Sequence, residues 1–162
     1  VWLPNAIEGA QAQLSRVYFD PAKYGTITAS SCAANGVVDA VKDGRRPASS
    51  ADATLDAWVS SGDSEKEWIQ MVFDQPQTIE RLGLFWVSCD QVEIPADWRM
   101  EYLLDGNWHP FEKYITDVYG VSKDRFNTIH PAAELMCEGL RINIDAQAGK
   151  SVGLFDLELN LR

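Results

Sequence analysis

The hairpin pattern at residues 94–111 constrains this chain more than any other stretch. Trp98, Met100 and Tyr102 alternate with polar residues, which is the period of two of a half-buried β-strand. Asp105-Gly106 follows this run, and a tight hairpin turn needs positive φ, which glycine adopts without steric cost. We therefore predict a β-hairpin here, with further short strands stacked against it.

The rest of the chain shows the same strand period and no long amphipathic helix. Residues 68–73 and 82–86 form two such segments, and Pro76-Gln77 should turn the chain between them. The other period-two segments are residues 25–31, 140–144 and 155–159, and in the last of these Phe155, Leu157 and Leu159 are expected to face one way. Short strands separated by turn signals predict an all-β sandwich of about eight antiparallel strands.

The strand pattern covers residues 25–162, which we interpret as one domain. Residues 1–24 lack a clean period and carry two prolines and a glycine, so we predict a linker or an N-terminal extension there. Two long surface loops are expected, at residues 32–57, with one helical turn near 37–41, and at residues 113–128. Loops of this length in compact domains are often functional or held in place by other groups.

The charge of the chain excludes some partners. It has 14 basic and 24 acidic side chains and a net charge of −10, and neither half forms a basic face, so nucleic acid is a poor partner. Membrane insertion is not expected, because no apolar run approaches the ~20 residues of a spanning helix. The chain begins with neither a methionine nor a signal peptide, and we expect it to be a piece of a longer protein.

The three cysteines, Cys32, Cys89 and Cys137, are far apart in the sequence. Without a CxxC pair, structural zinc and dithiol redox chemistry are not expected. We predict three buried thiols that behave as small hydrophobic side chains. One disulfide with one remaining thiol is the alternative.

Several motifs, taken in order, resemble the discoidin or factor V/VIII C-type family over roughly residues 25–162. They are Ala-Ser-Ser at 29–31, Asp43-Gly44, Trp58-Val59-Ser60, Glu67-Trp68-Ile69-Gln70, Leu84-Phe85-Trp86, the 94–111 hairpin, and Leu140-Arg141-Ile142. This resemblance implies a galactose-binding-like jelly-roll sandwich.

A narrower resemblance covers residues 94–127. Its motifs are Pro95 followed by Trp98-Arg99, then Asp105-Gly106 with Trp108, then the run Tyr119–Asn127. They are similar to the C-terminal domain of bacterial β-L-arabinofuranosidase-type glycoside hydrolases. This resemblance implies a non-catalytic accessory domain, monomeric when isolated, from a secreted, periplasmic or cell-surface enzyme. Its partner would be a glycan, or else the catalytic domain of its own parent chain.

The family resemblance also implies a structural calcium ion. Calcium takes about six to eight oxygen ligands, usually carboxylates mixed with loop carbonyls. The implied ligands are the carboxylates of Asp43 and Asp156 and carbonyls near Ala40, Arg46 and Phe155. The chain departs from the family pattern here, because two arginines and a long Ser/Ala-rich insertion follow Asp43-Gly44. The alternative is that Asp43 only shapes a turn and Asp156 is solvated.

The second long loop carries the candidate sugar-binding residues. Such sites combine an aromatic platform with a few directional donors and acceptors on loops. The candidates are Tyr119, Lys123, Asp124, Arg125 and Asn127, with Trp86 at a strand end. The alternative is structural: Trp86 and the four tryptophans in strand patterns (Trp58, Trp68, Trp98 and Trp108) would fill the core, and Asp124 and Arg125 would pin their own loop by a salt bridge.

Nothing in the sequence indicates catalysis. The chain has no GxSxG, no HExxH and no phosphate-binding glycine loop. Its two histidines, His109 and His130, each precede a proline, as ordinary surface residues do. Two functions therefore remain open: a carbohydrate-binding module, and a structural domain that docks on a catalytic domain without binding sugar.

Overall fold

The computed structural model describes residues 25–161, so the linker expected at 1–24 lies outside the described part. The elements are β1 (Gly25–Ala29), η2 (Val38–Lys42), β2 (Trp58–Val59), β3 (Lys66–Trp86), β4 (Asp97–Leu104), β5 (Asn107–Pro110), β6 (Asn127–Ile129), β7 (Leu135–Asp145) and β8 (Gly153–Leu161). The helical turn expected near 37–41 is the 3-10 helix η2. Among the described residues, no helix has the length and apolar character needed to cross a bilayer.

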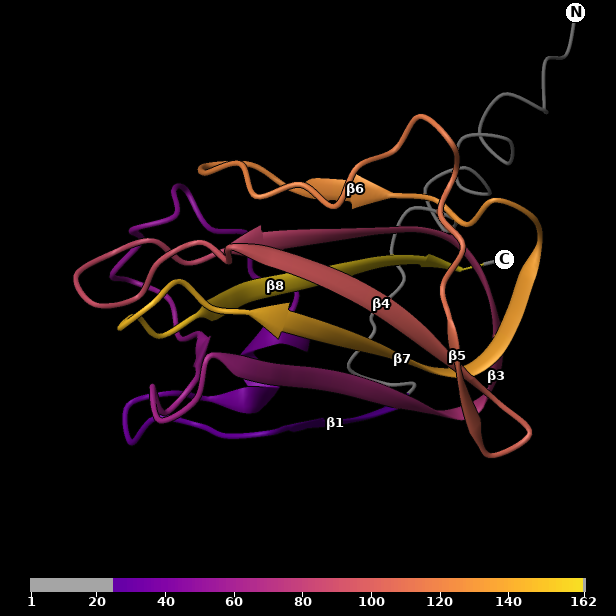
Figure 1. Cartoon of the computed structure of the whole chain (residues 1–162), viewed down its shortest axis with the longest axis horizontal. Coiled ribbons are helices and arrows are strands. Elements are labelled where there is room, and N and C mark those ends of the chain that lie inside the picture. Colours follow the sequence, from indigo (N-terminus) through magenta and orange to yellow (C-terminus); the bar gives the residue numbers. More distant parts are fainter. Residues whose placement is uncertain (1–24, 162) are drawn as a thin grey trace, which may run out of the picture.

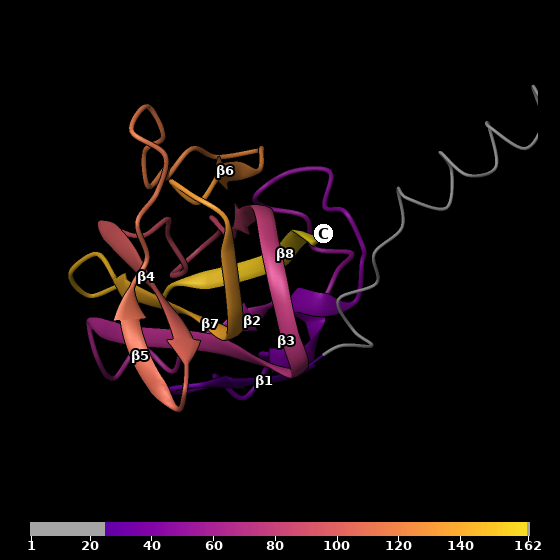
Figure 2. The same cartoon turned by 90° about the vertical axis from the view of Figure 1, so that its right-hand side faces the viewer.

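All strand pairings are antiparallel, and the long strand β3 belongs to both layers of a sandwich (Figures 1 and 2). Its first half pairs with β1 and β7, and β7 continues through β4 to β5. Its second half pairs with β6 and β8, and β8 pairs with β2. The predicted all-β sandwich of about eight strands is confirmed.

The turn expected at Pro76-Gln77 is not a turn between two strands. Instead β3 runs from Lys66 to Trp86, and its pairing with β7 shifts register between Val72 and Gln77. A proline has no N–H for a strand ladder, so it is tolerated where the ladder is interrupted. The interruption is the point where β3 crosses from one layer to the other.

The core lies between the layers and includes the predicted hairpin face. Trp98 and Met100 are buried, and Tyr102 packs against them in part. The turn residues Asp105 and Gly106 have φ of 50° and 74°, as the predicted tight turn requires. The rest of this core includes Trp58, Ile69, Met71, Phe73, Leu82, Leu84, Trp86, Leu140, Ile142, Ile144, Leu154, Leu157 and Leu159.

Three aromatic residues differ from their expected positions. Trp68 and Trp108 were predicted in the core, but both are only half-buried and lie against Arg141. Phe155 was expected on the face of Leu157, but it packs in a separate cluster with Phe85. The β3–β8 pairing shifts register after Phe85, and such an irregularity breaks the alternation of faces.

The prediction of three buried thiols is wrong for two of them. Cys137, on β7, is buried, and burial raises the pKa of its thiol to about 11. Cys32 and Cys89 are exposed, and all three thiols are free. Both exposed cysteines lie in loops, where no core-facing strand position determines their burial.

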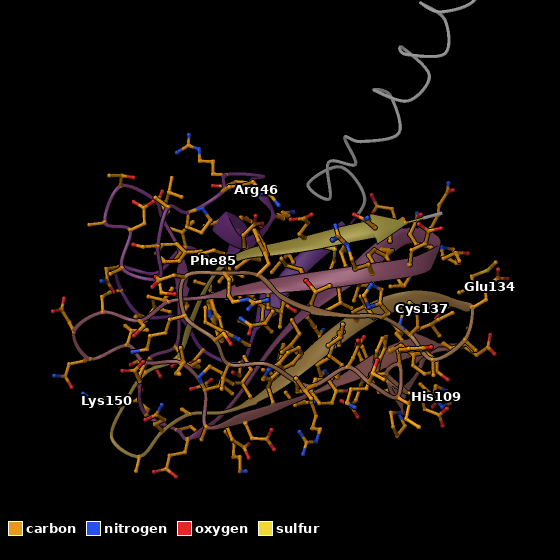
Figure 3. All side chains as sticks on the ribbon, turned by 90° about the horizontal axis from the view of Figure 1, so that it is seen from above. Arg46, Phe85, His109, Glu134, Cys137 and Lys150 are labelled. Atoms are coloured by element: carbon orange, nitrogen blue, oxygen red, sulfur yellow. The ribbon has the colours of Figure 1, made fainter. Side chains whose placement is uncertain are left out.

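The sandwich has two distinct ends. The loop end carries the connections β3–β4 and β7–β8 and the tip of the 111–126 loop, and Lys150 marks it in Figure 3. The opposite end carries the β4–β5 hairpin and the end of β8, with His109 and Glu134 labelled towards it. Several loops that are separate in the sequence therefore lie at one end of the sandwich, where these loops can form one surface.

A substitution at Gly139 tests the pairing of β7 with β3. A Cβ there would lie 2.6 Å from the carbonyl oxygen of Met71, so β7 and β3 would have to move apart. We expect Gly139→Ala to destabilise the domain by about 1–3 kcal/mol in urea denaturation. Met136→Ala is the matched control, because this residue is on the same strand and 60% exposed, and it should change stability by less than about 0.5 kcal/mol. Equal effects would contradict the described register.

Candidate functional site

Two buried tryptophans hold the 111–126 loop at the loop end. Both Trp86 and Trp98 donate their indole N–H to the carbonyl oxygen of Gly120, at 3.1 and 2.8 Å. A Cβ on Gly120 would lie 2.6 Å from Oδ1 of Asn127, so a glycine is needed for this approach. Trp86 is 0% exposed: the core alternative is confirmed for it, and its ring is not available as a sugar platform.

Asn127 clamps the same loop from inside. Its Nδ2 donates to the carbonyl oxygens of Leu84, Ser122 and Arg125, at 3.3, 3.0 and 3.3 Å. Its Oδ1 accepts from the N–H of Ser122 at 2.9 Å, and the residue is buried. The amide is therefore fully used in shaping the loop and offers nothing to a ligand from this position.

Asp124 ties the two long loops together. It has a φ of 59°; its Oδ1 accepts from the N–H of Ser50 at 2.7 Å, and its own N–H donates to the Ser50 hydroxyl at 2.8 Å. Ser50 in turn accepts from the N–H of Ser88. No Asp124–Arg125 ion pair forms among the described residues, so the loop is pinned through Ser50 and not by the expected salt bridge.

Lys123 pairs with a carboxylate of the neighbouring β3–β4 connection. Its Nζ lies 3.1 Å from Glu93 Oε1, which also accepts from the Ser88 hydroxyl at 2.7 Å and from the N–H of Ile94 at 2.9 Å. The Ser88 bond, the Ile94 bond and then Lys123 lower the pKa of Glu93 to about 2. Lys123 remains half-exposed, so its ammonium can still donate outward.

Arg125 and Tyr119 differ in the part of the side chain that is accessible to a ligand. Arg125 is exposed, and within the described residues its guanidinium has no hydrogen-bond or ion-pair partner. Tyr119 packs edge-on against Trp98 at 4.7 Å between ring centres, with the Arg99 guanidinium 5.3 Å from its ring, and burial raises its pKa. Of the six predicted sugar residues, Lys123 and Arg125 offer free donors, Tyr119 offers part of a ring, and Trp86, Asp124 and Asn127 build the scaffold.

Two of the three aromatic residues that differ from their predicted positions lie elsewhere, on the outer face of the β1–β3–β7–β4–β5 layer. These are Trp68 and Trp108, on either side of Arg141. A signal was present for Trp68: because Ile69 and Met71 face the core, strict alternation puts Trp68 on the opposite face.

Two carboxylates of the predicted calcium site, those of Asp43 and Asp156, lie close enough to interact electrostatically. Asp156 is 5% exposed, so the alternative in which its carboxylate is solvated is wrong. Burial, then Glu158, then Asp43 raise the pKa of its carboxyl to about 7, and Arg46 opposes this. The Arg46 guanidinium also pairs with Glu158 at 2.6 Å. The buried carboxyl of Asp156 thus lies near two partly exposed carboxylates, which disfavours its own negative charge and favours a nearby cation.

The donor set fits a hard cation only when backbone oxygens take part. Among residues 25–161, no three His, Cys, Asp or Glu side chains are placed to hold a metal together. The carbonyl of Ala40 accepts from the N–H of Asp43 at 3.1 Å, and Asp43 Oδ1 accepts from the N–H of Arg45 at 2.8 Å. Asp43 therefore shapes a turn in any case, and calcium would need loop carbonyls beside Asp43 and Asp156.

Comparisons with known proteins agree with this architecture. The model of one family, the F5/8 type C domain, matches residues 26–154. A comparison with curated proteins found no match. Among solved structures, a chain of the Streptococcus pneumoniae β-galactosidase BgaA has a TM-score of 0.68 at 11% identity, covering 84% of this chain and 96% of that one.

Of two further similar structures, one was solved with a bound sugar and the other is named for the glycan that it binds. The family 32 carbohydrate-binding module of NanJ from C. perfringens, solved with galactose, has a TM-score of 0.67 at 10% identity and covers 86% of this chain and 96% of that one. Chitosan-binding module 1 of a Paenibacillus chitosanase/glucanase has a TM-score of 0.65 at 18% identity, with 88% and 98% covered. At these identities the likeness shows the fold alone.

The Glu93 carboxyl gives a test of the loop-end geometry. Because its pKa is depressed, its interactions stabilise the fold above its ordinary value of 4.5 and are lost as the pH falls towards about 2. In an NMR titration of the wild type, we expect Glu93 to titrate near 2. Ser88→Ala should raise this pKa more than Lys123→Met does, because the Ser88 bond is the larger cause. An ordinary pKa in the wild type would contradict the described contacts.

Proposed function

The chain belongs to the F5/8 type C domain family, and from this we propose that it is a carbohydrate-binding accessory domain of a larger glycoside hydrolase. We propose a bacterial parent of the β-L-arabinofuranosidase type that acts outside the cytoplasm, with this domain non-catalytic and monomeric. The family match carries the proposal. Relatives in fold that were solved with galactose or named for binding chitosan support it.

The loop end supplies the chemistry that this function needs. Arg125 and Lys123 are adjacent to Asp124, which is fixed through Ser50, and to a loop fixed through Gly120. Donors on a fixed loop lose little conformational entropy when a ligand binds. Their ammonium and guanidinium groups would donate to sugar hydroxyls, and Tyr119 would contribute the accessible part of its ring.

A structural calcium ion is the second part of the proposal. The carboxylates of Asp43 and Asp156 would hold it, with carbonyls near Ala40, Arg46 and Phe155. The convergence of Asp43 and Glu158 on a buried Asp156 supports this assignment. When bound, the ion would supply positive charge that joins the 32–57 loop to β8, away from any chemistry on the sugar.

The alternative function is docking, and one surface favours it. The turn at residues 114–118 presents Ile115, which is 88% exposed, with Tyr114 and Val118 also exposed. Asp117 Oδ2 accepts from the N–H of His130 at 2.7 Å and lies 3.0 Å from its ring Nδ1, so the turn is anchored. A fixed apolar tip of this kind suits a protein contact.

A glycan titration tests the binding function. In chemical-shift titrations with galactosides, arabinosides and pectic oligosaccharides, we expect weak binding, from millimolar to high micromolar Kd, or about −4 to −6 kcal/mol. Attachment to a parent enzyme would make such affinity effective through local concentration. Shifts should concentrate at residues 119–127, and Arg125→Ala and Lys123→Ala should weaken the response.

Ile115→Ala is the control for this titration, because it lies on the apolar tip and should leave glycan binding unchanged. A folded domain that ignores every glycan at tens of millimolar would refute the binding function. Docking would then be supported if Ile115→Ser, in the intact parent chain, lowered the melting temperature of the assembled protein but not that of the isolated domain.

Addition of calcium to the metal-free protein tests the proposed calcium site. Starting from protein shown to be metal-free, saturating calcium should raise the melting temperature, since a ligand at a hundredfold excess over Kd stabilises the native state by about 2.7 kcal/mol. Asp43→Ala and Asp156→Asn should each abolish this gain. Thr54→Ala, in the same loop, should keep it. If millimolar calcium does not change the melting temperature of the wild type, the calcium site is refuted and the only role of Asp43 is to shape its turn.

A further inference from the structure

The outer face of the β1–β3–β7–β4–β5 layer carries a stack of three flat side chains. The Arg141 guanidinium carbon lies 4.0 Å from the ring centre of Trp108 and 5.5 Å from that of Trp68. Trp68 is on β3 and Trp108 on β5, three strand intervals apart. Both rings lie near the same guanidinium, so they form one surface feature.

The strand register places polar side chains around this stack. Gln70, Arg141 and Glu101 are direct cross-strand neighbours on β3, β7 and β4, and these strands lie side by side in Figure 1. Trp68 pairs with Asn143 in the next row, and Trp108 pairs with Leu103. Because facing residues on paired strands share a side of the sheet, these side chains all project from the outer face.

Hydrogen bonds fix the polar groups in place. Arg141 Nε donates to Gln70 Oε1 at 2.9 Å, and Asn143 Nδ2 donates to Glu101 at 2.8 Å. Gln70 Nε2 and Asn143 Oδ1 have no partner among the described residues. The face thus keeps one free amide donor and one free amide acceptor beside the rings, each held in a defined position.

The indole N–H groups distinguish these two tryptophans from the other three that the structure describes. Trp58, Trp86 and Trp98 each donate to a backbone carbonyl, at 2.8, 3.1 and 2.8 Å. Trp68 and Trp108 donate to no described residue, and both are half-buried on an open face. They therefore combine apolar area with an unused donor, as ligand-binding aromatic residues do.

The charges of this face are balanced, although the chain as a whole carries −10. Lys66 pairs with Asp145 at 2.7 Å, and Arg99 pairs with Asp97 at 2.7 Å. Arg141 lies 3.7 Å from Glu101. A face without net charge suits a neutral polar ligand and disfavours a polyanion such as nucleic acid.

We propose that this face binds a neutral oligosaccharide that lies across the strands. The sheet-face site consists of Trp68, Gln70, Glu101, Trp108, Arg141 and Asn143. Its rings would pack against the C–H faces of successive sugars, and its amides and indole N–H groups would bond their hydroxyls. This inference rests on the proposed glycan-binding function and names the ligand class: a chain of sugars, where the loop end suits a single small sugar.

The test uses neutral cello-, xylo- and manno-oligosaccharides on the whole chain. In chemical-shift titrations the indole N–H signals of Trp68 and Trp108 should move, and the hexasaccharide should bind at least about tenfold more tightly than the monosaccharide, since only the longer ligand contacts both rings. Trp108→Ala should weaken hexasaccharide binding by about five- to tenfold. Tyr114→Ala, an exposed aromatic elsewhere, should leave it unchanged.

Gln70→Ala is the second variant, because it removes the free amide donor and truncates neither indole ring, and it should also weaken hexasaccharide binding. If the chemical-shift changes are confined to residues 119–127, and if Trp108→Ala and Gln70→Ala bind the hexasaccharide as tightly as the wild type, the sheet-face site is overturned. The proposed function would still stand. Equal affinity for monosaccharide and hexasaccharide would also overturn it. No binding of any sugar would overturn both proposals.

Discussion

One backbone carbonyl, that of Gly120, accepts hydrogen bonds from two indoles in the core, and the geometry of the loop end depends on it. The indoles of Trp86 and Trp98 come from strands in opposite layers, and their rings pack edge to face at 5.7 Å. A buried N–H without an acceptor is costly, so core packing and loop position are coupled. The loop that carries Lys123 and Arg125 is thus placed by the interior of the sandwich.

This coupling divides the loop into two kinds of residue. The polar groups of Asn127 and Asp124 form hydrogen bonds with neighbouring backbone and with Ser50. Their neighbours in sequence remain accessible: Arg125 is exposed, and Lys123 stays half-exposed although it pairs with Glu93. A polar loop residue is as available to stabilise its own turn as to contact a ligand, and only the three-dimensional partners decide between the two.

The sequence was sufficient for the fold and for part of the candidate site. Strand alternation and the Asp105-Gly106 turn predicted the hairpin correctly, because both are local. The course of β3 past Pro76 was missed, since a change of layer depends on distant partners. Trp86 and Asn127 were named as sugar residues on residue type, which does not reveal an acceptor such as Gly120. Trp68 was assigned to the core because it lies in a strand pattern, although the alternation around Ile69 placed it outside.

The passage of β3 through both layers has a consequence for synthesis and folding. Neither layer can be completed separately, because each includes one half of the same strand. Of the partners of that strand, β7 and β8 come last among the described strands, so the edges of β3 that pair with them stay open until nearly the whole domain has left the ribosome. Pairing over such long sequence separations is slow. The nascent domain therefore passes through a stage in which open β-edges are exposed to other chains.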